Sequence, residues 1–508
     1  MGSRRSTRRR AATVALAAAT VLGTATACTT DPGSASTGSH SSATRAVAGR
    51  TLAGTAMTAC TINGARPVKA QSPALCGVLR VPEDRSRPQG RQVALRVAVV
   101  PALGPRQDAD PLFVLAGGPG DAATEFFAWL PSVFEDVHAK RDIVLVDQRG
   151  TGGSNRLTLP QLPDLTGLSA PRARSRLDAL SRTALASVDA DPRFYTTAVA
   201  ADDLEAVRAA LGYDRVDLYG TSYGGTVAQY YLRQHGDRVR TAVLDGTTPV
   251  DVPVLELQGR NSQAALELLF RRCGADAACG QAFPRLAADW QALLRRFAEP
   301  VKVTDPGSGA VQVVDREQLG DAVHTALLTE SGASVVPLAV HLAAGGHLLE
   351  AASLIGTSDQ GGPSLLMADE VLCSESWAAY DPARVLQRGR ESYLVPRELD
   401  RARLRAAMCA HLPQGVVPAD DGAAVRTQTP ILWVAADGDP QDPPANLRSV
   451  PAQEPRSRIV VVPAQEHVAG HLGCLPSVIA AFLDAGSADG LDVSCVARSA
   501  PAQGFRVR

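Results

Sequence analysis

The stretch that decides the fold prediction is Val216-Asp217-Leu218-Tyr219-Gly220-Thr221-Ser222-Tyr223-Gly224-Gly225. Its apolar start, Val216–Tyr219, has the length of a buried strand, and a helical pattern follows Ser222 toward Gln234. A Gly-x-Ser-x-Gly motif between a strand and a helix is the context of a nucleophile elbow, in which small residues beside the serine allow a sharp turn. We therefore predict that Ser222 is a nucleophile and that the backbone N–H of Tyr223 stabilises an oxyanion.

A serine nucleophile needs a histidine to accept its proton and an acid to orient that histidine, in the chain order Ser, Asp, His for this kind of turn. Of the nine histidines, only His467 and His471 lie late enough, and His467 follows the predicted strand Ile459–Val462 by a short loop. His471 is interpreted as a surface histidine or one beside a disulfide. Three acids follow the predicted strand Ile431–Ala435: Asp437, Asp439 and Asp442. The residues alone leave the choice among these acids open.

The spacing of His467 and His471 is also that of a zinc site on a helix. Val468, however, stands where the metalloprotease motif has its glutamate, and Gly470 disfavours a helix. The sequence also lacks the repeated Cys-x-x-Cys spacing that supplies thiolate ligands. We therefore predict neither a metal nor any other cofactor.

A second oxyanion donor is expected in the loop after an early strand. The apolar run Leu112–Ala116 leads into Gly117-Gly118-Pro119-Gly120, where the absence of side chains lets backbone N–H groups approach a substrate carbonyl. We predict that Gly118, with Gly117 beside it, supplies this donor. The alternative is a glycine turn without a role in the site.

Short apolar runs bounded by turn residues predict buried strands. Beyond those already named, they are Val93–Val100, Ile143–Asp147 and Ala242–Asp245. A helical pattern at Ala200–Leu211 lies between two of them, and strands alternating with helices predict a mostly parallel sheet. This rhythm stops after Pro249 and resumes near Thr429. The pattern of the residues between these two points predicts a helical cap, most clearly at Leu255–Phe270, Leu286–Phe297 and Val336–Leu354.

The first residues have the features of an export signal. Five arginines precede the apolar run Ala11–Leu22, which is too short to span a bilayer: Arg4, Arg5, Arg8, Arg9 and Arg10. The run ends in Ala25-Thr26-Ala27-Cys28, similar to a bacterial lipobox, so we expect lipidation of Cys28, an ordinary secretory signal being the alternative. The predicted division is a signal at 1–27, a flexible tether at 28–55, a core at 56–250 and 426–508, and a cap at 251–425.

Composition and cysteine usage agree with export. With 51 basic and 52 acidic residues, nothing indicates a nucleic-acid partner, and a membrane is expected to be contacted only through the lipid anchor. Cys28 apart, eight of the nine cysteines remain to pair in an oxidising compartment. Proximity in the chain suggests Cys60 with Cys76, Cys273 with Cys279, Cys373 with Cys409 and Cys474 with Cys495, although spacing leaves other pairings open.

Three ordered motifs resemble the prolyl aminopeptidase family of α/β hydrolases: residues 117–120, Asp147-Gln148-Arg149-Gly150-Thr151-Gly152, and the turn around Ser222. The secreted tripeptidyl-aminopeptidase-like proteins of actinobacteria are more similar still. Their Tyr-Thr-Thr segment, Asp-Pro-x-x-Pro-Pro acid loop and histidine-to-cysteine segment resemble Tyr195-Thr196-Thr197, residues 439–444 and residues 467–474. The resemblance extends from about Cys60 to Val496.

The resemblance implies an α/β-hydrolase fold with an inserted helical cap, and a triad of Ser222, His467 and Asp439. It selects Asp439 over Asp437, and His467 over His471. It also implies an acidic cap residue that binds the substrate's ammonium group. Glu375 resembles the family's Cys-x-Glu, with a solvated surface glutamate as the alternative and with Asp369 and Glu370 as weaker candidates.

Two positions depart from the family pattern. Ala116 precedes the glycine loop, where His or Asn-Pro is frequent, and Glu466 precedes His467, where Gly is usual. Glu466 is expected to shift the pKa of the base or to tether a partner segment. Neither departure removes a member of the triad.

The expected function is therefore that of an exported, monomeric serine exopeptidase acting on the free N-terminus of peptides. An esterase or lipase is the main alternative, because ester and amide cleavage use the same triad. A catalytically inactive binding protein of the cell envelope is a second alternative.

Overall fold

The computed structural model describes residues 50–508 except 65–70, 105–109, 129–130, 159–174, 177–178, 180–181, 184, 305–310, 350–364 and 500–503. The expected signal, Cys28 and the tether as far as residue 49 lie outside the described residues. The first described strands, β1 (Thr51–Leu52) and β2 (Thr55–Ala56), pair in an antiparallel ribbon. The last residues of the expected tether therefore take part in ordered structure.

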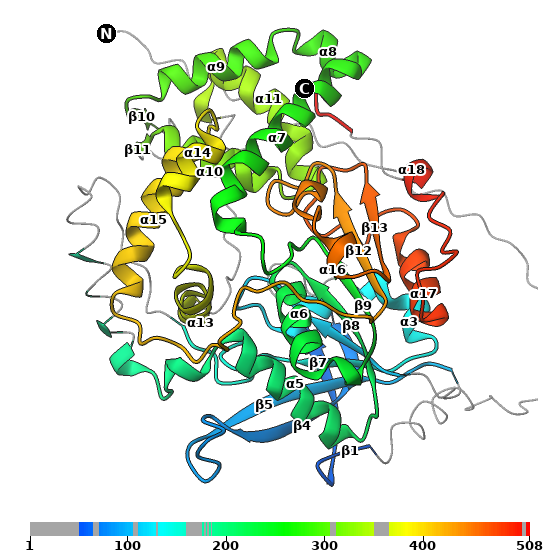
Figure 1. Cartoon of the computed structure of the whole chain (residues 1–508). Helices are drawn as coiled ribbons and strands as arrows, with labels where there is room; N and C mark the ends of the chain where they lie inside the picture. Colours follow the sequence, from blue (N-terminus) through cyan, green and yellow to red (C-terminus); the bar gives the residue numbers. More distant parts are fainter. Residues whose placement is uncertain are drawn as a thin grey trace, which may run out of the picture. The chain divides into compact units, whose positions relative to one another are not determined.

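One nine-stranded sheet forms the core of the described residues, in the order β13-β12-β9-β8-β6-β7-β5-β4-β3 (Figure 1). Six neighbouring strands are mutually parallel: β7 (Ile143–Val146), β6 (Leu112–Leu115), β8 (Val216–Thr221), β9 (Val239–Asp245), β12 (Ile431–Ala436) and β13 (Ser457–Val462). At the other edge β5 (Gln92–Val100), β4 (Gln71–Pro82) and β3 (Thr58–Asn63) pair antiparallel. The predicted mostly parallel sheet is confirmed.

Helices cover both faces of the parallel strands. Because both faces are buried, the sequences of these strands are continuous apolar runs. Alternate residues along each strand point to opposite faces and form two separate apolar clusters. One cluster includes residues of α5 (Thr197–Leu211) and α6 (Tyr223–His235). The other includes residues of α2 (Ala123–Phe127), α3 (Glu135–His138) and α17 (Leu475–Ala485). The strands are therefore buried on both sides, so their carboxyl ends form the accessible edge for a site.

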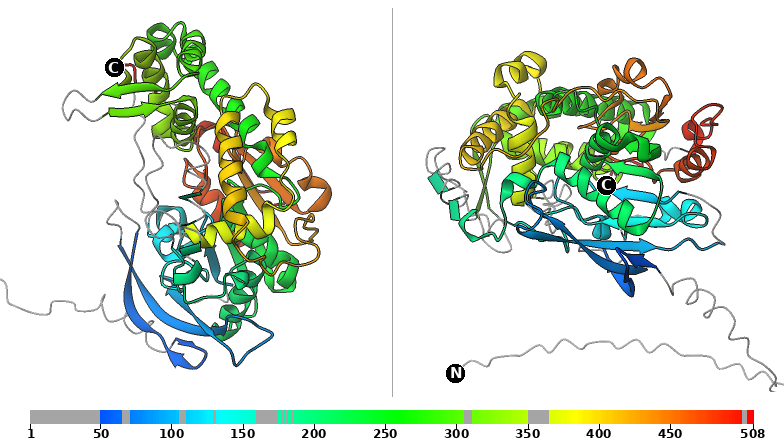
Figure 2. Two further views of the ribbon diagram at one scale, coloured as in Figure 1. Left: turned by 90° about the vertical axis from the view of Figure 1, so that its left-hand side faces the viewer. Right: turned by 60° about the horizontal axis from the view of Figure 1, so that its bottom comes forward.

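The chain between β9 and β12 is largely helical and contains its own apolar core, and we call it the helical insertion. Its helices are α7 (Val254–Ala275), α8 (Ala277–Ala282), α9 (Leu286–Arg296), α10 (Arg316–Ala326), α11 (Glu330–Ala344), α13 (Leu365–Val371), α14 (Pro382–Gly389) and α15 (Val395–Cys409). Its core includes Leu269, Trp290 and Val336, each almost fully buried. Helices α7 to α11 lie together, away from strands β4 and β5, in all three views (Figures 1 and 2).

The predicted helix Val336–Leu354 was wrong in its position. Helix α11 starts six residues earlier, at Glu330, because Thr329 caps it by accepting a hydrogen bond from Gly332 N–H. It ends at Ala344, ahead of Gly345 and of Gly346, whose φ is +99°. Residues 350–354 of the prediction lie outside the described part. The insertion also contains an antiparallel hairpin, β10 (Val301–Thr304) and β11 (Val311–Val314), that the helical pattern missed.

Four disulfides join described cysteines, and they have the pairings suggested by proximity in the chain: Cys60–Cys76, Cys273–Cys279, Cys373–Cys409 and Cys474–Cys495. The bond Cys373–Cys409 matters most for the site, because it joins the segment that carries Glu375 to α15. Within the described residues, none of the helices combines the length and the apolar character needed to cross a lipid bilayer.

Candidate active site

The turn between β8 and α6 holds Ser222 in a strained conformation at the carboxyl edge of the sheet. Ser222 has φ 51° and ψ −125°, a region that residues with side chains rarely occupy. Its N–H donates to Asp245 O, 2.9 Å away at the end of β9. The neighbouring glycines are required because backbone atoms lie where a side chain would begin. A Cβ on Gly220 would lie 2.5 Å from Gly224 O, and a Cβ on Gly224 would overlap Leu115 O. The strain is therefore fixed by packing on both sides of the serine.

The structure brings Ser222, His467 and Asp439 into one hydrogen-bonded row. His467 Nε2 lies 3.0 Å from Ser222 Oγ, and His467 Nδ1 lies 2.8 Å from Asp439 Oδ2. Asp439 is buried, and its Oδ1 accepts hydrogen bonds from the N–H groups of Gln441 and Asp442. The row can therefore transfer a proton from the serine to the imidazole while the aspartate holds the ring in place.

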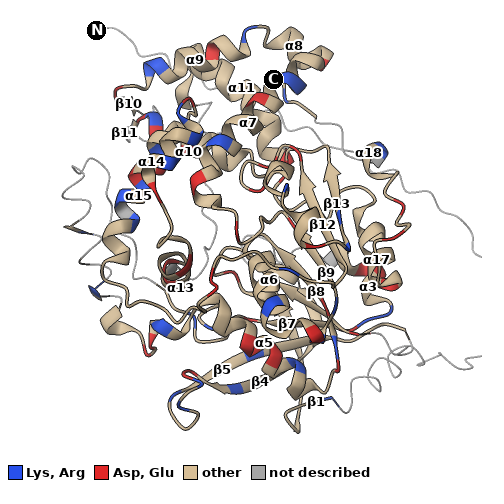
Figure 3. Cartoon of the chain, in the orientation of Figure 1, with Lys and Arg blue, Asp and Glu red and all other residues tan. Residues whose placement is uncertain are grey.

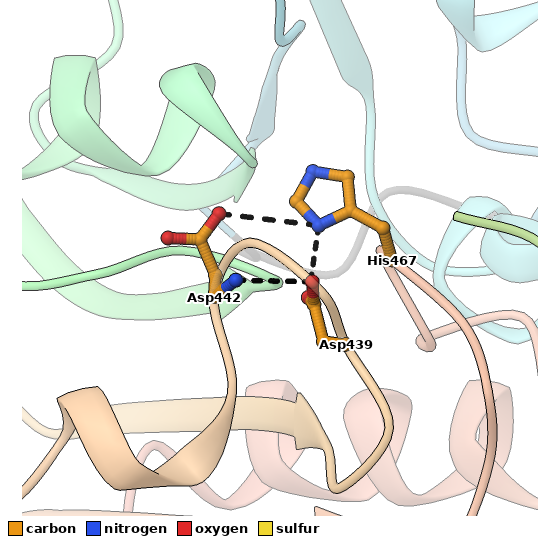
Figure 4. A group of neighbouring side chains, drawn as sticks. All are labelled: Asp439, Asp442 and His467. Atoms are coloured by element: carbon orange, nitrogen blue, oxygen red, sulfur yellow. Dashed lines mark hydrogen bonds and ion pairs between the residues drawn. The ribbon is translucent and has the colours of Figure 1, made fainter. Parts of the chain in front are cut away.

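The other candidate acids and histidine occupy different positions. Asp442 Oδ2 lies 3.9 Å from His467 Nδ1 (Figure 4). Asp442 Oδ1 accepts a hydrogen bond from Thr248 Oγ1 at 2.5 Å. Asp437 instead pairs with Arg272 of the helical insertion at 2.7 Å. His471 has a buried Nδ1 without a partner among the described residues. Asp439 is thus the acid that contacts the base directly.

Asp442 nevertheless contributes negative charge beside the base. Burial, followed by the charge of Asp439, raises the pKa of Asp442 to about 7. Burial alone would lower the pKa of His467, but Asp439 and then Asp442 and Asp245 outweigh it and raise that pKa to about 9. The imidazole is therefore strongly basic and holds a proton readily once it receives one.

This pKa predicts how the reactivity of Ser222 changes with pH. The imidazole accepts the serine proton only when it is neutral, and it becomes protonated as the pH falls below about 9. We expect the rate at which a fluorophosphonate probe labels Ser222 to fall progressively from pH 10 to pH 7. Labelling by mass spectrometry at a series of pH values measures this rate. A flat rate over that range would show that another group, or a lower pKa, governs the base.

Asp439, Asp442 and His467 also have the composition of a cation site, because one donor atom from each lies within 4.8 Å of the others. Their contacts fit an acid–base pair better. Asp439 Oδ1 already accepts two backbone N–H groups, and the Nδ1 of His467 faces Asp439 Oδ2. We derive no step from a metal at this position.

The residues predicted to supply oxyanion donors lie beside Ser222. Tyr223 is the first residue of α6, where N–H groups have no partner within the helix. The glycine loop lies against the serine, because a Cβ on Gly117 would be 3.1 Å from Ser222 Cβ. Gly118 and Ser222 line the same cavity. The placement of all three residues is suited to the oxyanion role predicted for Tyr223, Gly118 and Gly117.

A cavity of about 330 Å³ opens beside Ser222 and is lined by core loops and the helical insertion. Its walls contain five acidic side chains: Asp251, Glu256, Glu375, Asp421 and Asp442. None of the described residues that line it is Lys, Arg or His. Over the rest of the described chain, basic and acidic residues are interspersed (Figure 3). The cavity is thus selectively acidic and suited to a cationic group.

Glu375 is held in the cavity wall by the N-terminus of α5. It lies on the π-helical segment η4 (Leu372–Ser376), and its Oε1 and Oε2 accept from Thr197 N–H and Thr197 Oγ1, both at 2.7 Å. Burial raises the pKa of Glu375 to about 8. Among the described residues, none forms an ion pair with it. A half-buried carboxyl without a cationic partner among the described residues fits a ligand that brings one.

The weaker candidates, Asp369 and Glu370, are absent from the described lining of the cavity. Glu370 Oε1 accepts from Ser374 Oγ, which supports the segment carrying Glu375. Two of the other lining acids already have partners in the protein: Glu256 pairs with Arg384 at 2.7 Å, and Asp421 accepts a hydrogen bond from Tyr230 OH. Glu375 is therefore better placed than these to receive an external cation.

Several cavity residues were missed from the sequence. Asp251 and Glu256 lie at the start of the insertion, and of these only Glu256 falls within the predicted helical pattern Leu255–Phe270, while Asp421 lies in the long segment before β12. Thr197 belongs to the Tyr-Thr-Thr segment, which was noted without a role. Its hydroxyl also lies 2.7 Å from Tyr223 OH, so it connects the wall of Glu375 to the elbow.

Comparisons with known proteins agree with this geometry. Residues 110–473 match the family described as alpha/beta hydrolase fold. The chain is 30% identical over 236 residues to the serine protease Hip1 of Mycobacterium tuberculosis (42% of this chain, 44% of Hip1), and 30% identical over 190 residues to a tripeptidyl aminopeptidase of Streptomyces coelicolor (34% and 35%). The chain thus spans less than half the length of either relative. A proline iminopeptidase structure from Mycobacterium smegmatis aligns over 81% of this chain and 98% of its own, with 17% identity and a TM-score of 0.35.

Proposed function

The chain belongs to the alpha/beta hydrolase fold family, and on that premise we propose that it is an exported serine peptidase that removes residues or short peptides from the free N-terminus of peptides. The similarity to Hip1 and to a tripeptidyl aminopeptidase supports a peptide substrate. The observation that carries the proposal is the acidic cavity beside Ser222, which contains Glu375.

The reaction would follow the Ser-His-Asp scheme. Ser222 Oγ attacks the scissile carbonyl as His467 Nε2 takes its proton, and Asp439 stabilises the resulting imidazolium. The N–H groups of Tyr223 and Gly118 stabilise the oxyanion. His467 then returns the proton to the leaving amine, and water hydrolyses the acyl-enzyme with His467 again as the base.

Recognition of the free N-terminus is assigned to Glu375. A peptide's α-ammonium carries the positive charge that the cavity lacks, and its binding would favour the ionised form of a carboxyl whose pKa lies near 8. The cost of ionising this half-buried carboxyl would then be offset only when the substrate is present. This makes a free amine a condition of productive binding.

The test compares matched substrates with the purified mature protein. We expect cleavage of tripeptidyl or prolyl p-nitroanilides with a free N-terminus and a fall of kcat/KM by about 100-fold after N-acetylation, because a desolvated charge contact is lost. Hydrolysis of p-nitrophenyl esters without cleavage of any peptide amide would instead establish an esterase. Absence of both activities and of labelling at Ser222 would establish a binding protein.

Export is proposed as part of this function. Disulfides form and persist in oxidising compartments, and the described residues contain four of them. Together with the arginine-flanked apolar run at the N-terminus, they support translocation out of the cytoplasm. Lipidation of Cys28 and a monomeric state remain proposals.

A further inference from the structure

Three consecutive residues of the loop that carries the base are hydrogen-bonded to the helical insertion. Gln465 Nε2 donates to Ala265 O of α7 at 3.2 Å. Glu466 Oε2 accepts from Glu330 N–H at 3.0 Å, and His467 N–H donates to Leu328 O at 2.9 Å. The backbone around the base is thus hydrogen-bonded to Ala265, Leu328 and Glu330 of the insertion, each more than one hundred positions away in the sequence.

The contact of Glu466 is made at a specific point, the first residue of α11. The N–H of Glu330 has no acceptor within the helix, and the N-terminus of a helix favours a negative charge. Glu466 is 7% exposed, so its carboxyl group meets this N–H largely away from water, and this burial raises the pKa of Glu466 to about 8. Helix α11 continues into the apolar core of the insertion through Ala333 and Val336, both fully buried. The helix is therefore a rigid support for the loop.

The two contacts on either side of Thr329 act as a pair. Leu328 O receives the N–H of His467, and Glu330 N–H is received by the side chain of the preceding residue, Glu466. Together these bonds constrain the backbone at His467 from the insertion, while Asp245 of the core constrains the next residues by accepting from Ala469 N–H and Gly470 N–H. The imidazole must reach Ser222 Oγ and Asp439 Oδ2 at once, at 3.0 Å and 2.8 Å. A small displacement of this backbone would break one of the two.

We propose that Glu466 is a positioning residue for the catalytic base: by holding the N-terminus of α11 it keeps the backbone of His467 in register with Ser222 and Asp439. The insertion then supports proton transfer in addition to lining the cavity. This inference rests on the proposed role of the Ser222 triad. It assigns no contact between Glu466 and the substrate.

The test uses variants of Glu466 that separate the hydrogen bond from the carboxyl group. Glu466→Gln keeps an oxygen that accepts from Glu330 N–H, whereas Glu466→Asp keeps a carboxyl group but retracts its oxygens by one methylene. Glu466→Ala removes both. We expect Glu466→Ala and Glu466→Asp to lower kcat for a p-nitrophenyl ester by about 10- to 100-fold with KM nearly unchanged, because small misplacement of a catalytic group costs rate. Glu466→Gln should remain within about threefold of the wild type.

The matched control is Asp315→Ala, which removes the side chain that caps α10 in the same insertion through Glu317 N–H and Gln318 N–H. It should lower the melting temperature and leave kcat unchanged. Equal kcat in all Glu466 variants, or a loss no larger than that of Asp315→Ala, would overturn the inference alone. If Glu466→Ala fails to fold, the kcat values of Glu466→Asp and Glu466→Gln are compared instead. The inference requires the lower kcat in Glu466→Asp. A wild type that neither hydrolyses the ester nor labels at Ser222 would overturn the proposed function as well.

Discussion

Ser222→Ala is expected to lower kcat on a free tripeptidyl amide by at least about 10⁴-fold and to abolish labelling by a fluorophosphonate probe. The variant keeps the cavity and the N–H groups of the elbow, but it removes the oxygen that lies 3.0 Å from His467 Nε2. Alanine keeps the Cβ that lies beside Gly117 and removes only the hydroxyl. KM should change little, since substrate contacts in the cavity remain.

The measurement combines steady-state kinetics with intact-protein mass spectrometry after exposure to the probe. Ser487→Ala is the matched control, because Ser487 lies in an exposed turn after α17 and bonds only locally, to Asp489. It should label and turn over like the wild type. Substantial turnover by Ser222→Ala would show that another nucleophile carries the reaction.

The elbow was predictable from sequence because all its determinants are local. A buried strand, two close-packed glycines and a helix start fall within about ten consecutive residues, and each leaves a mark in the pattern. The late strands were likewise predicted from apolar runs, although β9 and β13 begin two or three residues earlier than expected, at Val239 and Ser457. Their first residues are polar or lie at the sheet margin, where pairing rather than hydrophobicity extends the strand.

Features that depend on contacts between distant segments were harder to predict from the sequence. Strand β4 (Gln71–Pro82) includes two prolines and exposed polar positions, so its pattern does not resemble a strand, yet it pairs along its length with β3 and β5. The choice of Asp439 over Asp437 came from family resemblance, and in the structure it follows from the direction of the loop after β12. Asp437 turns to Arg272, a residue 165 positions away.

The acidic cavity was likewise hard to predict from the sequence. Glu375 and Thr197 are separated by 178 positions, and only the packing of η4 on the start of α5 brings them together. The disulfide Cys373–Cys409 helps to fix η4, since it ties the segment to α15. The sequence therefore indicated which residue to suspect, while the reason for its position came from the long-range packing of the insertion on the core.

Glu375→Gln is expected to lower kcat/KM for peptides with a free N-terminus by about 30- to 1000-fold. This corresponds to about 2–4 kcal/mol, the lower part of the range for losing one partner of a buried charge pair, because Glu375 is half-buried. Glutamine has nearly the same shape and still offers one oxygen to Thr197 N–H, so the α5 contact is largely kept. What it lacks is the charge that opposes the α-ammonium. Hydrolysis of an uncharged p-nitrophenyl ester should consequently stay within about threefold of the wild type.

The contrast between the two substrates identifies the role of the residue, and a nearby carboxyl provides the control. Glu370→Gln changes a buried acid five positions earlier that is outside the described lining of the cavity and bonds to Ser374. It should leave the ratio of peptide to ester hydrolysis unchanged. Equal losses on peptide and ester in Glu375→Gln would mean that the carboxyl supports the elbow through Thr197 and Tyr223 instead of binding the amine. A loss confined to the peptide with a free N-terminus would place the substrate's ammonium group at Glu375. The difference in kcat/KM between wild type and variant should then be smaller when both are assayed on the N-acetylated peptide.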